Sequence, residues 1–306
     1  MWKRDKKHGA EEKRYDFTDT RGTRTFAVFN YTFLAVVALI CILPLINVLA
    51  VSFSGKTAAN ANIVGLWPVD FTLQSYKIIF TRPDILSSFG MSVLRTVLGV
   101  VINLVLTVMM AYPLSKSSKD FHGRNIYMTL TVFVMLFSGG MVPLYMLVYK
   151  LHMLNTVWAL VLPGAVPIFN VIMMMNFFRG LPHGIEEAAL VDGADVFSTL
   201  MRIVIPLSKP VIATVVLFQF VAHWNDWFSG LLYMSDMSKY PLQTLLQSTL
   251  SSVDITNLEQ ARLYANVSDR TLRAAQIFVT TLPILLLYPF LQKYFAKGVV
   301  LGAVKG

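Results

Sequence analysis

The chain has 306 residues, of which 55% are hydrophobic and only 14% are charged. About a quarter of the residues in a typical soluble domain are charged. The composition therefore argues against an ordinary soluble fold and favours a chain whose main solvent is lipid. The formal net charge of +9 suggests either nucleic acid or an anionic membrane surface as a partner. The single cysteine, Cys41, excludes an intrachain disulfide.

The first 25 residues are polar and basic, and they predict a cytoplasmic N-terminal tail rather than a cleaved signal peptide. Beyond them lie apolar runs that are continuous rather than alternating, which indicates membrane helices and not a barrel. A helix needs about 20 apolar residues to cross the bilayer core. The sequence therefore predicts an all-α polytopic membrane protein with six transmembrane helices, at 26–53, 91–114, 125–149, 156–178, 207–234 and 272–292.

Lysine and arginine residues predict the orientation of these helices. With the N-terminus inside, the cytoplasmic segments hold 17 basic residues and the outer segments hold 8. We therefore expect a multi-pass protein of the cell (inner or plasma) membrane, with both termini in the cytoplasm and long outer loops at 54–90 and 235–271. Basic residues at the cytoplasmic ends would bind anionic lipid. This explains the net charge without a nucleic-acid partner.

The predicted cytoplasmic loop 179–206 interrupts the apolar pattern with "EEAALVDGADVFSTLMRIVIP", Glu186 to Pro206. Pro182 suits the first turn of a helix, and Glu186 and Glu187 follow it, where negative charge favours the helix dipole. "DG" at 192–193 breaks that helix, and a second short helix from about 194 to 201 can follow. The loop thus predicts two short helices on the membrane surface with small residues and carboxylates available to a partner.

The spacing within this loop carries a resemblance. Glu187-Ala188-Ala189, three residues, Gly193, nine residues, Ile203 and then Pro206 resemble the EAA motif of ABC importer permeases, with Ile205 where the usual pattern has leucine. The segments "WPVDFTLQSYKIIF", "WNDWFSGLLYM" and "KGVVLGAVKG" look like those of the carbohydrate-type permeases, and the last is similar to the tail of the maltose-type permease that lacks extra helices. The resemblance covers most of the chain after residue 25.

The resemblance implies a type I ABC importer permease fold. Its domains would be a basic tail (1–25), a six-helix permease domain (26–296) with a coupling loop (179–206), and a cytoplasmic C-terminal tail (297–306). It also implies transport of a sugar by alternating access, with a homologous permease as heterodimer partner, two ABC ATPase subunits and an extracellular or periplasmic sugar-binding protein. ATP and Mg would bind the ATPase subunits, so this chain would bind no cofactor and would not itself be an enzyme.

The resemblance assigns candidate site residues in two regions. The candidates for ATPase coupling are Glu186, Glu187, Ala188, Ala189, Asp192, Gly193, Ile203 and Pro206. The candidates for contact between the tail and the ATPases are Gly298, Gly302, Lys305 and Gly306, in a segment whose small residues suit an extended chain.

Polar residues within the predicted spans define a third candidate region, because such groups usually face a cavity or a partner helix. The candidates for the substrate path are Gln219, His223, Trp224, Asn225, Asp226 and Trp227. They offer the hydrogen-bonding groups and flat apolar surfaces that sugars need. Helix packing is an equally good explanation for them. Arg95 and Asn103 also lie within a span, and we expect Arg95 to snorkel or pair with a helix rather than bind sugar.

Other patterns carry no site. "SGKT" at 54–57 lacks the earlier glycine of a P-loop and follows a membrane span rather than a strand. The histidines are dispersed without metal-ligand spacing. A secondary, ion-coupled transporter would explain the spans and intramembrane polar residues but not the spaced cytoplasmic loop. An ABC permease for a non-sugar solute would share that loop but not the carbohydrate-type segments.

Overall fold

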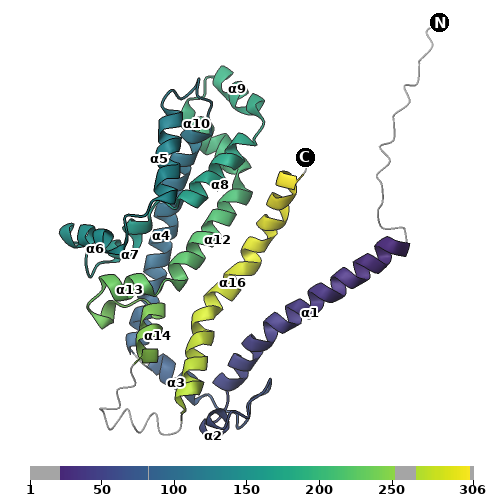
Figure 1. Ribbon diagram of the computed structural model, residues 1–306, viewed down its shortest axis with the longest axis vertical. Helices are drawn as coiled ribbons and strands as arrows, with labels where there is room; N and C mark the ends of the chain where they lie inside the picture. The colour runs from purple at the N-terminus through teal and green to yellow at the C-terminus, as the bar shows by residue number, and fades with distance from the viewer. Residues whose placement is uncertain (1–20, 82, 252–266, 304–306) are drawn as a thin grey trace.

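The computed structural model describes residues 21–81, 83–251 and 267–303, and this part of the chain is helical without a strand (Figure 1). The elements are α1 (Arg21–Ser52), α2 (Lys56–Asn60), α3 (Gln74–Thr81), α4 (Pro83–Ser115), α5 (Arg124–Leu136), α6 (Met141–Lys150), α7 (Val157–Val161), η1 (Leu162–Gly164), α8 (Ile168–Arg179), α9 (His183–Val191), α10 (Val196–Thr199), the π-helical turn η2 (Leu200–Val204), α11 (Ile205–Leu207), α12 (Lys209–Asn225), α13 (Phe228–Tyr233), η3 (Met237–Lys239), α14 (Leu242–Ser251) and α16 (Asp269–Ala303).

The long helix α4 is the centre of the bundle, where it packs against both α8 and α12. Ala111 on α4, Val171 and Met174 on α8, Val204 on η2 and Val215 on α12 are buried in one apolar cluster. Lipid tails are as apolar as these side chains, so close packing rather than water exclusion must hold the helices together. The cluster joins the loop between α8 and α12 directly to the long helices, because η2 belongs to that loop.

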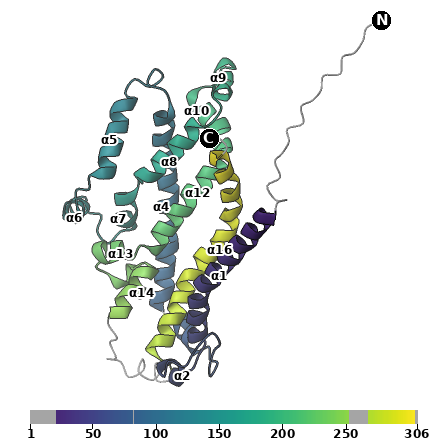
Figure 2. The same ribbon diagram turned by 45° about the vertical axis from the view of Figure 1, so that its right-hand side comes forward.

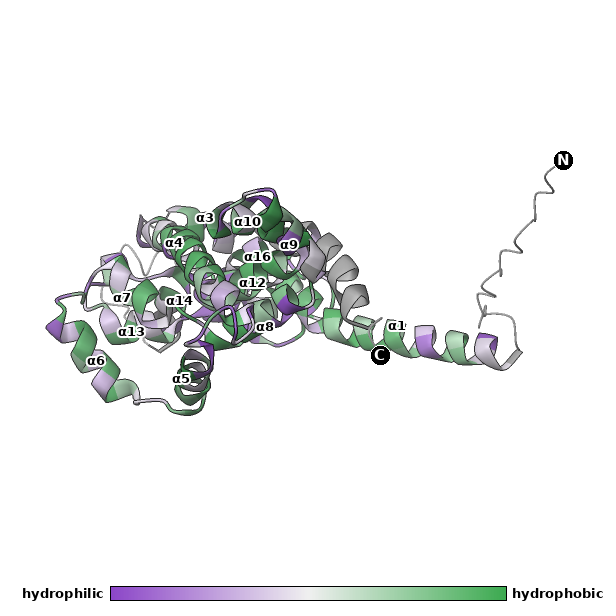
Figure 3. Cartoon of the chain, turned by 90° about the horizontal axis from the view of Figure 1, so that it is seen from above, coloured by the Kyte–Doolittle hydropathy of each residue, from purple (hydrophilic) through white to green (hydrophobic). Residues whose placement is uncertain are grey.

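Helix α1 stands apart from the rest of the bundle (Figure 3). Its apolar side chains are exposed along most of its length, and only 11% of the residues in its most apolar 18-residue stretch are buried. It packs on α16 near its C-terminal end. A helix that is apolar on every face needs lipid or another chain around it. α1 continues as one helix through Pro44 and begins at Arg21, so residues 21–25 of the predicted tail are helical. Residues 1–20 lie outside the described residues.

The predicted spans correspond to two continuous helices and several bent ones. Gly22–Ser52 and Pro83–Ser115 are each long and apolar enough to cross a membrane, and three bent helix pairs would raise the number to five. The pairs are α5 with α6, α7–η1 with α8, and α10–α11 with α12, bent by 110°, 51° and 81°. The segment 272–292 lies within α16. Six spans therefore remain a prediction.

The bends within the predicted spans occur at positions that the pattern of apolar residues does not reveal. The predicted span 125–149 breaks between α5 and α6, where Gly140 has a φ of +88°, a conformation that side-chain-bearing residues rarely adopt. The predicted span 207–234 is interrupted at Ser208 and again after Asn225. The helix from Val196 to Leu207 therefore lies at the bundle end, across the direction of α12.

The two long predicted outer loops meet at the end of the bundle opposite α9 and α10 (Figures 1 and 2). The Ser87 hydroxyl, near the start of α4, donates to the Ser238 carbonyl at 2.8 Å. Arg270, at the start of α16, donates to the Ala59 carbonyl at 3.2 Å. The geometry therefore agrees with loops 54–90 and 235–271 sharing one side of the membrane. Residues 252–266 of the second loop lie outside the described residues.

Candidate functional site

The loop between α8 and α12 folds into two short helices joined by a tight turn at Gly193. The Ala194 N–H donates to the Ala189 carbonyl at 2.9 Å, and the Gly193 N–H donates to the Leu190 carbonyl at 3.1 Å. These two bonds, with Gly193 at a φ of +82°, form a Schellman motif, which satisfies the last carbonyls of α9. The predicted helix break at 192–193 is thus confirmed, and its cause is the left-handed conformation of Gly193.

The second helix, α10, begins at a capping aspartate. The Asp195 carboxylate accepts a hydrogen bond from the Ser198 N–H at 3.3 Å. This hydrogen bonding from Ser198 lowers the pKa of Asp195 below its ordinary value of 3.8, so the cap is ionised at neutral pH. The predicted helix 194–201 begins at Val196 in the structure, and after Thr199 the chain continues as the π-helical turn η2. Pro206 follows, and it has no N–H to donate to a normal helical bond.

The coupling candidates differ in exposure. Glu187, Ala188, Asp192 and Gly193 are exposed, while Ala189 is buried at 7% exposure. Ile203 is half-buried within η2, and Pro206 is exposed in α11. Glu186 is half-buried and forms an ion pair with Lys116, at the end of α4. The two adjacent glutamates therefore differ in environment: Glu186 is paired within the chain, and Glu187 is exposed.

An apolar patch on this loop was missed from the sequence. Val191 is 87% exposed and Phe197 is 64% exposed, with Leu190 and Val196 also exposed beside them. We call these four residues, with Glu187, the coupling surface. The sequence shows that these residues are apolar, but it does not show whether their side chains face the bundle or the outside. The turn at Gly193 sets the direction of both helices, and in that arrangement the four apolar side chains are exposed.

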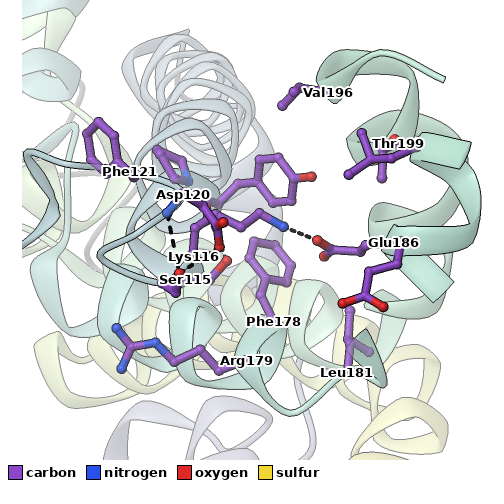
Figure 4. Close-up of a pocket in the computed structure, with 15 residues that line it drawn as sticks. Ser115, Lys116, Asp120, Phe121, Phe178, Arg179, Leu181, Glu186, Val196 and Thr199 are labelled. Atoms are coloured by element: carbon purple, nitrogen blue, oxygen red, sulfur yellow. Dashed lines mark hydrogen bonds and ion pairs between the residues drawn. The ribbon is translucent and has the colours of Figure 1, made fainter. Parts of the chain in front are cut away.

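A pocket of about 510 Å³ separates α9 from the end of α4 (Figure 4). Tyr112 and Phe178 line it, with Lys116, Glu186 and Glu187. In Figure 4 the Lys116 side chain extends toward Glu186, and the dashed line marks their ion pair. The coupling loop is thus connected to the bundle here by a charged contact next to open space.

The candidate substrate-path residues fall into two groups. Gln219, His223 and Trp224 are buried, and they face other helices of the same chain. The Asn103 side-chain amide on α4 lies 2.5 Å from Gln219 Oε1 and 3.1 Å from His223 Nε2. The Trp224 indole N–H donates to the Thr280 carbonyl of α16 at 2.8 Å. These three candidates hold α12 against α4 and α16.

The second group lies at the end of α12. Asn225 is exposed, Asp226 is half-buried and Trp227 is 41% exposed. Arg95, which is almost fully buried on α4, pairs with the Asp226 carboxylate and also donates to its backbone carbonyl at 2.7 Å. The helix-pairing role expected for Arg95 is therefore confirmed. Asn225 and Trp227 are the path candidates whose side chains remain accessible.

Two of the four C-terminal candidates lie near the end of α16. Gly298 and Gly302 are within this helix, which continues to Ala303, so the extended conformation expected for residues 298–303 is wrong. Two glycines spaced by apolar residues do not break a helix that contains no proline after Pro289. Lys305 and Gly306 lie outside the described residues. Figure 1 shows α16 ending toward the same end of the bundle as α9.

Across residues 21–81, 83–251 and 267–303, no group of three histidine, cysteine, aspartate or glutamate residues could hold a metal ion. Cys41 is a free, exposed cysteine on α1.

The chain is a helical bundle with candidate membrane spans and a turned pair of short helices at one end. Residues 103–301 match the family described as the binding-protein-dependent transport system inner membrane component. This match spans more than half of the chain, so the chain belongs to that family. It is a membrane-embedded transport component rather than an enzyme, and membership implies ATPase and binding-protein partners.

Individual relatives agree with the family. The chain is 44% identical over 289 residues to Protein LplC of Bacillus subtilis, covering 94% of this chain and 97% of that one. It is 41% identical to the polygalacturonan/rhamnogalacturonan transport system permease protein YtcP of the same organism, covering 92% and 99%. A solved structure of a bacterial ABC transporter involved in the import of the acidic polysaccharide alginate matches with a TM-score of 0.82 and 31% identity, over 90% of this chain and 98% of that one.

Proposed function

We propose that this chain is the permease subunit of an ATP-driven importer for a sugar or oligosaccharide, which an extracellular or periplasmic binding protein delivers. The similarity to YtcP, to the arabinooligosaccharide permease AraQ of Halalkalibacterium halodurans at 30% identity, and to the alginate importer supports a carbohydrate substrate. The observation that carries the proposal is the exposed coupling surface at one end of the bundle, in a chain of this family. The family does not support the secondary transporter considered from the sequence.

The coupling surface is the proposed docking site for an ATPase subunit. Val191 and Phe197 are exposed on α9 and α10, the two short helices at the end of the bundle. Exposed apolar residues clustered in one place mark an interaction site. Glu187 lies beside them and would pair with a basic residue of the ATPase. ATP and Mg would bind the ATPase subunits, and this chain would bind neither.

The proposed mechanism is alternating access within a permease heterodimer, with two ATPase subunits on the cytoplasmic side. An ATPase can bias the inward- and outward-facing states only through contacts that differ between them. In this chain α9 and α10 offer those contacts, with both termini on the same side of the membrane. Residues 298–306 would contact the ATPases, and their deletion is expected to reduce transport while leaving the bundle folded.

The proposed substrate path includes Asn225 and Trp227, which are accessible at the end of α12. An amide and an indole supply a hydrogen-bonding group and a flat apolar face for a sugar ring. Asp226 lies between them in the sequence, but its carboxylate is already paired with Arg95. Gln219, His223 and Trp224 would act on the path indirectly, by holding α12.

Reconstitution tests the proposal. The chain would be expressed with the ATPase, second permease and binding protein encoded near its gene, purified, and inserted into liposomes with ATP inside. We expect uptake of a radiolabelled oligosaccharide that requires ATP and the binding protein, measured over a panel of neutral and uronic-acid oligosaccharides. Uptake of an amino acid or a metal ion instead of every sugar would contradict the carbohydrate assignment. Uptake that needs an ion gradient but no ATPase would contradict the whole proposal.

A further inference from the structure

The cytoplasmic end of α4 is held by several charged side chains from different elements. The Leu114 carbonyl accepts a hydrogen bond from Arg124 of α5 at 3.0 Å and another from Arg179 of α8 at 3.0 Å. These two arginines satisfy one of the last carbonyls of α4, which lacks a partner within its own helix. The end of α4 is therefore fixed to its neighbours, and a force applied there acts on the bundle.

Lys116 is the next charged residue, one position beyond the end of α4. Its ammonium group lies 4.1 Å from the centre of the Tyr112 ring and pairs with the Glu186 carboxylate of α9. The two paired side chains are 23% and 22% exposed, so water only partly screens them. A partly buried charge-assisted hydrogen bond is stronger and more directional than a surface ion pair.

The pair crosses a region that apolar packing does not fill. Helix α9 packs mainly against its sequence neighbour α10, and the pocket of about 510 Å³ lies between it and the end of α4. Close-packed side chains normally transmit a displacement from one helix to the next. The apolar cluster connects η2, not α9, to α4. Across the pocket, the contact that joins α9 itself to the end of α4 is a charged one.

We propose that Lys116 and Glu186 form the link that passes the movement of α9 to α4. This inference rests on the proposed function, in which an ATPase moves the coupling loop. Lys116 is then a positioning residue, and Glu186 acts inside the chain while Glu187 faces the ATPase. Displacement of α4 would reach α12 through the contact of Asn103 with Gln219 and His223, and through the Arg95–Asp226 pair.

The test compares single substitutions with a charge exchange in the reconstituted complex. Lys116→Met and Glu186→Gln each remove one charge of the pair, and Lys116→Met should leave ATPase copurification and basal ATP hydrolysis at the wild-type level. They should lower the amount of oligosaccharide transported per ATP by about tenfold, the scale for loss of one charge-assisted hydrogen bond. Lys116→Glu with Glu186→Lys should restore at least half of the wild-type ratio. Lys119→Met is the matched control, because it removes an exposed positive charge from the same loop.

Each outcome separates the link from the docking surface. Glu187→Gln should reduce copurification instead of the transport ratio. If Lys116→Met transports with the wild-type ratio, or if the charge exchange assembles but does not restore it, the link is wrong. If Lys116→Met fails to assemble, the charge-exchange variant decides the test. Assembly with a restored transport ratio supports the link, and assembly without it contradicts the link. Failure of the wild-type chain to copurify an ATPase would instead overturn the proposed function.

Discussion

Arg95 on α4 and Asp226 at the end of α12 lie 131 residues apart in the sequence and form a two-point contact in the bundle. The guanidinium reaches both the carboxylate and the backbone carbonyl of Asp226. The other carboxylate oxygen accepts a hydrogen bond from the Ser229 N–H at 3.1 Å, at the start of α13. One arginine thus secures the break between α12 and α13, where the chain gives up regular helical hydrogen bonds.

Arg95→Met should destabilise the bundle because it leaves the Asp226 carboxylate without its charged partner. Breaking one side of a buried pair costs about 3 kcal/mol. The measurement is thermal unfolding of the purified complex in detergent, followed by tryptophan fluorescence. Arg95→Met with Asp226→Leu should recover part of the lost stability, because no buried charge remains. Equal melting temperatures for wild type and Arg95→Met would show that the pair is unimportant for stability.

Asn225→Ala and Asp226→Asn should differ in their effects on transport. Asn225 is accessible, so its truncation should weaken sugar uptake several-fold without changing the melting temperature. Asp226→Asn keeps an oxygen for Arg95 but removes the charge, so its main effect should be on stability. Concentration-dependent uptake and thermal unfolding of both variants check this. A lower apparent affinity for Asp226→Asn with unchanged stability would move Asp226 into the substrate path.

Gly99→Ala should be harmful although alanine is the better helix former. A Cβ at Gly99 would collide with the His223 imidazole, whereas a Cβ at Gly90 on the same helix would meet no atom within 4 Å. Overpacking in a tight interface costs about 1–3 kcal/mol. Gly90→Ala, the matched control, should stabilise by up to about 1 kcal/mol through helix propensity. The measurement is thermal unfolding of both variants. Equal melting temperatures would mean that α4 and α12 do not approach closely at Gly99.

Sequence reasoning reached the helical membrane fold and the coupling loop because both depend on local patterns. Long apolar runs and the spacing from Glu187 to Pro206 are visible within short windows of the chain. The helix bends were missed because they depend on single conformations, such as that of Gly140. The partners of Arg95 and Glu186 were missed because they lie 131 and 70 residues away, and only the packing of α4 brings them together.

The predicted orientation can be checked with two cysteine substitutions in a Cys41→Ser background. Ser118 follows the C-terminal end of α4, whereas Ser238 in η3 contacts Ser87 near the start of α4. Both are exposed. A membrane-impermeant maleimide added to intact cells should label Ser238→Cys but label Ser118→Cys only after lysis. The reverse labelling pattern would invert the topology and remove the coupling surface from the cytoplasm.

Gly193 offers the sharpest test of the coupling surface, because its conformation and its surroundings can be varied separately. Its φ of +82° costs a residue other than glycine, asparagine or aspartate about 1–2 kcal/mol, but a Cβ there would meet no atom of this chain within 4 Å. Gly193→Asn tolerates the turn and adds bulk, whereas Gly193→Asp adds the same bulk with a negative charge next to Glu187 and the apolar patch. Any loss of docking should therefore increase from Gly193→Asn to Gly193→Asp.

Gly184→Ala is the control for this series, because Gly184 lies in α9 with open space and an ordinary φ. The measurements are ATPase copurification and substrate-stimulated ATP hydrolysis in the reconstituted complex. We expect Gly184→Ala to match wild type, Gly193→Asn to weaken both, and Gly193→Asp to lose both while the melting temperature of the membrane domain stays the same. A Gly193→Asp complex that assembles and hydrolyses ATP like wild type would mean that the ATPase docks elsewhere, since both bulk and charge would then be tolerated at the centre of the coupling loop.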